Sequence, residues 1–329
     1  MLARIAAAVV LLAASITISC VESPESRSVE SPESRSVDSL ESRSVEGPES
    51  RSVEGPESRS RFVEVRAGYH HTCGLTIAGV VSCWGGTPHG EADAPGDDGF
   101  VQVATSRLFA GTTCGLTAVG SLKCWGIDEF GSAPAHREAA TGAYVQVSTS
   151  GYTTCAVRDD GGIECFGDDT YGNVSTAPTS TGFAQVSTNA FASCALRTDG
   201  EVLCWGDYAL GEPPSGPFIR VSVGTYHACG LRDNGVVECW GTNAFGQLNV
   251  PQGVYTDVEA GEYHVCAVTT RRSRAVCWGR TNTLEPVPAA GNHVQVTNGG
   301  YHNCVLERSG RISCWGAPEY SAPSRLGPR

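Results

Sequence analysis

Cysteine is the residue whose spacing in this chain most strongly predicts chemistry. The 329 residues include 15 cysteines, and 14 of these fall into seven pairs whose members lie ten or eleven positions apart. Paired cysteines can form a disulfide, bind a metal or carry out redox chemistry. The pairs are Cys73 with Cys83, Cys114 with Cys124, Cys155 with Cys165, Cys194 with Cys204, Cys229 with Cys239, Cys266 with Cys277 and Cys304 with Cys314.

The spacing disfavours two of these three chemistries. Structural zinc sites use ligands two to four residues apart with a second such pair nearby, and no cysteine pair here has that spacing. The Cys-x-x-Cys motif of redox proteins is also missing from the sequence. We therefore expect structural disulfides, no metal and no cofactor, in a protein that folds in an oxidising compartment.

Each cysteine pair encloses a predicted β-hairpin. Around Cys229 and Cys239 the apolar residues alternate, which puts Leu231 and Val237 on the same strand face as the cysteines. Asp-Asn-Gly at 233–235 suits the tight turn between the two strands. In this register the two cysteines face each other with α-carbons about 4.5 Å apart, which is close enough for a disulfide. The sequence thus predicts a disulfide across every hairpin.

The N-terminus has the layout of a secretory signal. A single charge at Arg4 precedes an apolar run over 5–18 that is too short to span a bilayer comfortably. The four residues before Cys20, Ile-Thr-Ile-Ser, resemble the lipobox of bacterial lipoproteins. Cys20 is also the one cysteine outside the pairs. We expect a signal peptide over 1–19 and a lipid on Cys20; the alternative is an ordinary cleaved signal with an incidental cysteine.

Residues 21–60 are five tandem octapeptides of the type VESPESRS. Almost none of their side chains can be buried, so the segment is expected to be disordered. Directly after a lipidated Cys20, the region 20–60 would be a tether with a root-mean-square span of about 35 Å. The alternative is filler whose length does not matter.

The charge of the chain disfavours nucleic acid as a partner. The net charge is −12. Each octapeptide carries two acids and one arginine, so removing the five octapeptides and Arg4 leaves −8 for residues 61–329. This region contains a single lysine, Lys123, and a domain this acidic would not be attracted to phosphates.

Residues 61–329 divide into seven repeats. Their first cysteines lie 35 to 41 residues apart, and the repeats start near residues 62, 100, 144, 183, 218, 255 and 293 with an aromatic residue or His, two residues and Val. Each repeat ends in Cys-Trp-Gly, with Phe166 replacing Trp once. The small residue after each first cysteine is expected to let a neighbouring sheet approach. Repeats of this length predict an all-β, seven-bladed β-propeller with one disulfide per blade.

The fifth repeat also resembles a known family. Its pattern Gly-x-Tyr-His-x-Cys-x-Leu-x-x-x-Gly-x-Val-x-Cys-Trp-Gly, followed by Thr-Asn-Ala-Phe-Gly-Gln-Leu at 242–248, is similar to the regulator of chromosome condensation repeat. The resemblance covers residues 62 to about 320 and implies a seven-bladed propeller. Only this repeat keeps the whole Gly-Gln-Leu segment, so the outermost strand is expected to be irregular elsewhere. In repeat length the chain is closer to bacterial secreted members, including the propeller-type β-lactamase inhibitor protein.

Motifs of catalysis are missing from the sequence. There is no Gly-x-Ser-x-Gly elbow, no phosphate-binding glycine loop followed by Lys, and no His-Glu-x-x-His. His71, His227, His264 and His302 occupy the same repeat position, where the family resemblance implies a structural histidine rather than a metal ligand. We therefore predict a protein that is not an enzyme.

The position before these histidines is rich in aromatic residues. In a propeller these residues would lie around one end of the ring, where aromatic side chains are typical of interface centres. The alternative is that each ring packs over its own blade, and the two roles are compatible. The candidate partner-binding residues, with Phe109 from an insertion in the second repeat, are His70, Phe109, Tyr152, Phe191, Tyr226, Tyr263 and Tyr301.

Together these features favour a non-enzymatic recognition domain. We expect a monomer, lipid-anchored to a bacterial envelope, that binds an extracellular protein or glycan through one loop face. Val21 after Cys20 is not the Asp that retains lipoproteins at an inner membrane, which favours the outer membrane or cell surface.

Other functions stay open. An enzyme with a site in the central funnel and a structural envelope component are the alternatives, and β-lactamase inhibition is a special case of recognition. The nuclear role that the family resemblance implies, nucleotide exchange on a small GTPase at chromatin, is disfavoured by the export signal, the acidic charge and the disulfides.

Overall fold

The computed structural model describes most of the repeat region. The predicted signal peptide, Cys20 and the octapeptide tether up to residue 59 lie outside the described residues. No helix long and apolar enough to span a membrane occurs in the part of the chain that the structure describes. The described ranges are 60–86, 89–96, 99–109, 111–133, 142–206, 210–280, 287–288 and 291–317.

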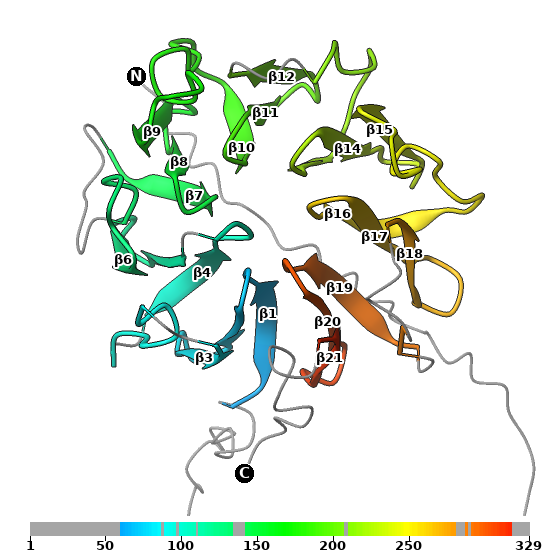
Figure 1. Ribbon diagram of the computed structural model, residues 1–329, viewed down its shortest axis with the longest axis horizontal. Coiled ribbons are helices and arrows are strands. Elements are labelled where there is room, and N and C mark those ends of the chain that lie inside the picture. The colour runs from blue at the N-terminus through cyan, green and yellow to red at the C-terminus, as the bar shows by residue number, and fades with distance from the viewer. Residues whose placement is uncertain are drawn as a thin grey trace, which may run out of the picture. The chain divides into compact units, whose positions relative to one another are not determined.

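The strands form seven antiparallel sheets of three strands each, which surround a central axis as the blades of a propeller (Figure 1). Three consecutive strands build each blade, and the first of them lies nearest the axis. The predicted seven-bladed, all-β fold is therefore confirmed. Blades 1 to 7 consist of β1 (Phe62–Ala67), β2 (His71–Thr76) and β3 (Val81–Gly85); β4 (Phe100–Thr105), β5 (Thr112–Thr117) and β6 (Leu122–Gly126); β7 (Tyr144–Thr149), β8 (Thr153–Arg158) and β9 (Ile163–Gly167); β10 (Phe183–Thr188), β11 (Ser193–Arg197) and β12 (Val202–Trp205); β13 (Arg220–Val223), β14 (His227–Leu231) and β15 (Val237–Gly241); β16 (Tyr255–Ala260), β17 (His264–Thr269) and β18 (Ala275–Gly279); and β19 (His293–Asn298), β20 (His302–Glu307) and β21 (Ile312–Gly316).

All seven predicted disulfides are present, one in each blade. Every disulfide joins the middle strand to the outer strand, with α-carbons 4.0 to 4.1 Å apart. In blade 5, Cys229 pairs with Cys239 and Leu231 pairs with Val237, which is the predicted register. Seven disulfides are typical of a protein that folds in an oxidising compartment.

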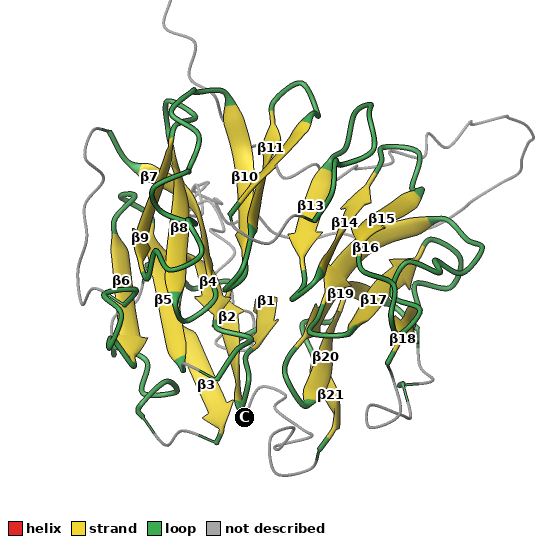
Figure 2. Ribbon diagram, turned by 45° about the horizontal axis from the view of Figure 1, so that its top comes forward, coloured by secondary structure: helices red, strands yellow, loops and turns green. Residues whose placement is uncertain are grey.

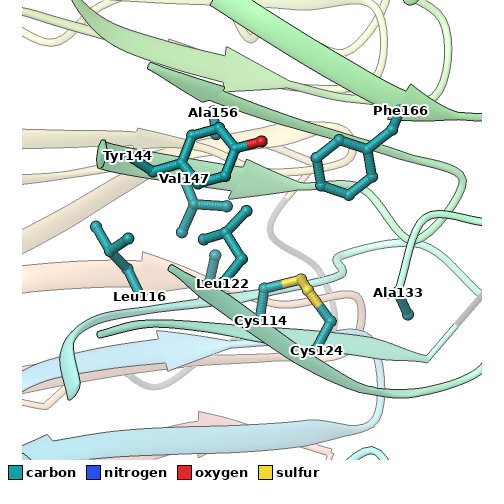
Figure 3. Packing of buried hydrophobic residues seen from close by; sticks show 10 residues of the cluster. Cys114, Leu116, Leu122, Cys124, Ala133, Tyr144, Val147, Ala156 and Phe166 are labelled. Atoms are coloured by element: carbon teal, nitrogen blue, oxygen red, sulfur yellow. A yellow bond between two sulfur atoms is a disulfide. The ribbon is translucent and has the colours of Figure 1, made fainter. Parts of the chain in front are cut away.

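The hydrophobic core lies between the blades. In blade 2, Cys114, Leu116, Leu122 and Cys124 form an apolar face that packs against Tyr144, Val147, Ala156 and Phe166 of blade 3 (Figure 3). The same arrangement recurs between the other neighbouring blades. Each disulfide therefore cross-links its hairpin and also packs against the next blade.

The ring closes by packing. Blade 1 and blade 7 each consist of consecutive strands, so among the described residues no strand is exchanged to close the ring. Cys304 and Leu306 of blade 7 pack on Phe62 and Val65 of blade 1, as at any other junction. Figure 2 shows the sheets standing side by side around the axis with loops at both ends.

The small residue after the first cysteine makes room for two groups. A Cβ on Gly74 would lie 3.0 Å from Ile312 Cδ1 of blade 7, so the neighbouring sheet does approach here as predicted, and 2.7 Å from the Phe62 ring of the blade's own inner strand, which was not predicted. This ring itself reaches the preceding blade. One expectation needs correction, because the Gly-Gln-Leu segment at 246–248 forms turns rather than an outermost strand.

Candidate functional site

The candidate aromatic residues lie at one end of the propeller. Each belongs to the connection between the inner and the middle strand of its blade, and these connections share one end because the blades have the same topology. We call this end the loop face. The opposite end carries the hairpin turns, such as residues 77–80 between β2 and β3.

One aromatic cluster spans blades 7, 1 and 2. The His70 and Tyr301 rings are stacked with centroids 5.8 Å apart, and the Phe109 ring lies 6.1 Å from His70. Tyr69, which the sequence analysis did not select, contacts Tyr301 and Phe109 with ring centroids 5.0 and 5.6 Å apart. Its hydroxyl also lies 2.9 Å from the Tyr301 hydroxyl.

A second aromatic row crosses blades 4, 5 and 6. Phe191 stacks on Tyr226 with centroids 5.6 Å apart, and Tyr226 stacks on Tyr263 at 6.0 Å. The predicted rings are therefore brought together into neighbouring contacts from blade to blade, apart from Tyr152, which has a different partner.

The sequence analysis missed a second aromatic position on the loop face. Phe130, Tyr171 and Phe245 each stand five residues after the Trp or Phe of Cys-Trp-Gly. Each of them packs on a ring of the next blade: Phe130 on Tyr152 at 4.9 Å, Tyr171 on Phe191 at 4.8 Å and Phe245 on Tyr263 at 5.2 Å between centroids. The recurrence of an aromatic residue before Gly at this spacing was the available signal.

These rings pack together and remain partly open to solvent. Phe109 is 68% exposed, Phe245 45% and Tyr301 41%, whereas the aromatic residues at the starts of the inner strands, such as Tyr144 and Phe183, are buried. Both roles that the sequence left open for the aromatic position, packing and surface display, are compatible with this geometry.

The loop face contains a hollow of about 360 Å³, which we call the funnel pocket. Its wall includes five aromatic rings, Tyr69, Phe109, Tyr152, Tyr171 and Phe191, together with the carboxyl groups of Asp168 and Glu262. Burial raises the pKa of Glu262, although Tyr263 and Arg280 act against this shift. The pocket draws on loops of blades 1, 2, 3, 4 and 6, so it lies over the central axis.

Below the loop face, a belt of hydrogen bonds links the inner strands. Gln146 of blade 3 donates to the carbonyl of Val186 in blade 4 at 3.1 Å and accepts from its N–H at 2.8 Å. Gln102, Gln185 and Gln295 bond in the same way to the central valine of the next inner strand. At the equivalent position Glu64 and Asp257 accept one bond each, and Arg220 donates one, so the belt is complete around the ring.

The charges in the channel inside this belt are balanced. Glu259 is buried against the guanidinium groups of Arg107 and Arg220, and Arg66 lies 3.9 Å away. Burial alone would raise the pKa of Glu259, but these arginines outweigh it and hold the pKa below its ordinary value. Arg107 comes from the insertion in blade 2 and also donates to the Ala260 carbonyl of blade 6. The inserted loop therefore crosses the channel beside the loop face.

The repeated histidines connect neighbouring blades. His71 Nε2 lies 2.8 Å from Thr113 Oγ1 of blade 2, and His264 Nε2 lies 2.9 Å from Asn303 Oδ1 of blade 7. Burial lowers the pKa of His71 and His227 to about 3 and that of His264 and His302 to about 4. Neutral imidazoles held in this way have a structural role. Among the described residues, no group of three or more His, Cys, Asp or Glu side chains is arranged to hold a metal ion.

Comparison with known proteins agrees with the predicted resemblance. A model of the regulator of chromosome condensation repeat matches residues 183–207 and 218–247, in blades 4 and 5. The chain therefore carries repeats of this type, as the sequence analysis predicted. A search of curated proteins by sequence gave no match.

Solved structures with the same fold include proteins from plants and yeast. The CRINKLY WD40 ectodomain of the Arabidopsis thaliana receptor kinase ACR4 is 24% identical, with a TM-score of 0.69 over 81% of this chain and 99% of that one. The ectodomain of the Physcomitrella patens receptor kinase CR4 is 24% identical, with a TM-score of 0.67 over 78% and 74%. Yeast RCC1 (Prp20), in a complex with Kap60, is 14% identical, with a TM-score of 0.59 over 79% and 82%. At this level of identity the similarity concerns the fold alone.

Proposed function

We propose that this protein is a non-enzymatic recognition domain that binds a protein outside the cell through its loop face. The observation that carries the proposal is the set of stacked, partly exposed aromatic rings around the funnel pocket. Rigid aromatic side chains lose little conformational entropy on binding and dominate interface energetics. Lipid attachment at Cys20 and the tether over 20–60 would display the domain at a bacterial outer membrane or cell surface.

The central channel does not provide an alternative site of the same quality. Its acids converge, but they converge on arginines within a space of about 170 Å³. Ionic groups that satisfy one another in this way hold the inner strands together. The structural neighbours fit the proposal, because two of them are receptor kinase ectodomains and a third is described with bound Kap60.

Site-specific crosslinking tests the proposal. A photo-crosslinking phenylalanine analogue is placed either at Tyr226 on the loop face or at Ile77, an exposed residue of a hairpin turn at the opposite end. After irradiation of cells of the native organism, the expected result is a discrete protein adduct from position 226 and none from position 77. Equal capture at both positions, or none at 226, would contradict the proposal.

A further inference from the structure

The inference concerns the chemistry of the funnel pocket and rests on the proposed function. Five aromatic rings from blades 1 to 4 line one hollow. The face of an aromatic ring carries negative electrostatic potential and attracts cations, most strongly where water is partly excluded. A hollow lined by several aromatic side chains is therefore suited to a positively charged group with an apolar stem.

The charged groups of the pocket have one sign. Asp168 and Glu262 are the two charged residues in the lining, which contains no Lys, Arg or His among the described residues. Arg280, outside the lining, interacts with Glu262 and stacks over Phe245 and Tyr263, and Arg107, which precedes the lining residue Leu108, is paired with Glu259 in the channel. The partial burial of Glu262 disfavours its charged form, so an incoming cation would restore a favourable environment for the carboxylate.

The polar atoms of the pocket favour a cation over a sugar. A sugar needs donors as well as acceptors, but the Thr170 hydroxyl already donates to Asp168 Oδ1 at 2.6 Å, and the Thr170 N–H bonds to the same atom at 2.9 Å. These bonds also fix the orientation of the Asp168 carboxylate. The lining also contains the hydroxyl groups of Tyr69, Tyr152 and Tyr171, of which the Tyr69 hydroxyl is bonded to that of Tyr301. All its charged groups are carboxylates, and the acidic charge of the chain would steer a basic partner towards them.

We propose that the funnel pocket receives the side chain of a lysine or arginine from the protein partner. The rings hold the aliphatic stem and the cation, and Asp168 and Glu262 neutralise the charge. With about 360 Å³, the hollow is at the lower end of the volumes of ligand sites, which suits a single long side chain.

Capped tripeptides test this chemistry directly. Gly-Lys-Gly, Gly-Arg-Gly and Gly-norleucine-Gly are titrated into the full, disulfide-intact protein and followed by ligand-observed NMR. The expected result is that both cationic peptides bind and that the norleucine peptide, which has a similar apolar stem and no charge, binds about tenfold more weakly. Equal binding of the norleucine peptide, or binding of the neutral sugar cellobiose in place of the cationic peptides, would overturn the proposal.

Matched variants locate the binding. Glu262→Gln is expected to weaken binding of the lysine peptide roughly threefold to fivefold, which is the effect of losing a partly exposed ion pair. Phe191→Leu keeps an apolar side chain but removes the aromatic ring, and it should weaken binding of the lysine peptide about threefold. Glu201→Gln, which removes one exposed acid at the opposite end, should leave binding unchanged. An equal loss in Glu201→Gln would show general charge attraction and overturn the assignment to the pocket.

The two proposals can fail separately. If the cationic peptides do not bind while crosslinking at position 226 still captures a partner, the loop face is a recognition surface and the assignment of a cation to its pocket is wrong. If the peptides bind and no partner is captured at 226, the pocket chemistry stands and the proposed function is wrong.

Discussion

The inner strands and the loop face are built from the same seven repeats, but their polar and aromatic side chains differ in how fully the neighbouring blades contact them. Along the inner strands, the glutamines, serines and charged residues find their partners in the next blade, as Gln146 and Ser148 do with the backbone of blade 4. On the loop face the rings contact each other but keep a large part of their surface open, 41% for Tyr301. Repetition alone therefore does not distinguish a structural position from a binding position. The difference lies in whether neighbouring blades already satisfy the group.

This comparison predicts that changes at the inner positions act on stability, and that changes on the loop face act on binding. The inner positions should show the larger changes in the free energy of unfolding and the loop face the smaller ones.

Acid should destabilise the ring through its buried histidines. Four of them have folded pKa values of about 3 or 4, below the ordinary value of 6.5, so the unfolded chain takes up protons that the native chain does not. Their contribution is complete above pH 6.5 and is lost as the pH falls towards 4, by up to about 1.4 kcal/mol per histidine and pH unit. Thermal unfolding at pH 7 and pH 5 should differ by several kcal/mol.

A single substitution assigns this effect. His264→Asn should reduce the pH dependence by about one proton, which the same unfolding measurements at pH 7 and pH 5 would detect. A free energy of unfolding that stays constant between pH 7 and pH 5 would show that the histidines are not held neutral.

Glu259→Gln should be the most damaging single substitution in the channel. It removes the acid that neutralises Arg107 and one of the two acids paired with Arg220, so the partly buried Arg107 guanidinium loses its counter-charge while Arg220 keeps Asp257. The expected cost is about 3 to 5 kcal/mol, equivalent to a decrease in melting temperature of about 10 °C. The same change at the exposed Glu201 is the control and should lower the melting temperature by less than about 2 °C. A similar, small effect in both variants would mean that the channel charges are solvated.

Removal of one disulfide should cost less. Replacing both Cys155 and Cys165 by Ala opens a hairpin loop of about eleven residues, which corresponds to roughly 2 to 3 kcal/mol in the chain-entropy model. Guanidinium unfolding of the double variant and of the unchanged protein measures the difference. Since Cys155 is buried in the junction with blade 4, some further loss from packing is expected. A double variant as stable as the unchanged protein would show that the disulfide neither restricts the denatured chain nor stabilises the junction between the blades.

Gln146→Leu should break one link of the inner belt. The Val186 N–H and carbonyl would lose their side-chain partner in blade 3, at a cost of about 1 to 3 kcal/mol. Val145→Ala, one residue earlier on the same strand and 45% exposed in the unchanged protein, should cost less than about 0.5 kcal/mol. Urea unfolding measures the free energy of unfolding of both variants. Equal losses would mean that water replaces the hydrogen bonds of Gln146.

The fold and the disulfides could be predicted from the sequence because both depend on local periodicity. The spacing of Cys229 and Cys239 determines which residues of one hairpin face each other, and the structure has the predicted pairs. The role of Arg107 depended on a contact with Ala260, 153 residues further along the chain, and no local pattern reports such a contact. The belt glutamines did recur in the sequence, but their function requires the distance between inner strands. The same limit applies to Gly74, where the approach of the neighbouring blade was predicted but the contact with the Phe62 ring of its own blade was not.

The smallest change in stability is expected on the loop face. Tyr226→Ala removes a ring that stacks between Phe191 and Tyr263 but is only partly buried. Two partly exposed aromatic pairs of about 0.5 kcal/mol each are lost, together about 1 kcal/mol, so the melting temperature should fall by about 2 to 4 °C. Capture of the partner by the crosslinker, placed at Phe245 for this experiment, should decrease at least tenfold, because central aromatic residues dominate binding energy. If Tyr226→Ala instead costs as much stability as Gln146→Leu and leaves capture intact, the rings belong to the structural architecture of the ring like the inner belt, and the distinction between the two regions is wrong.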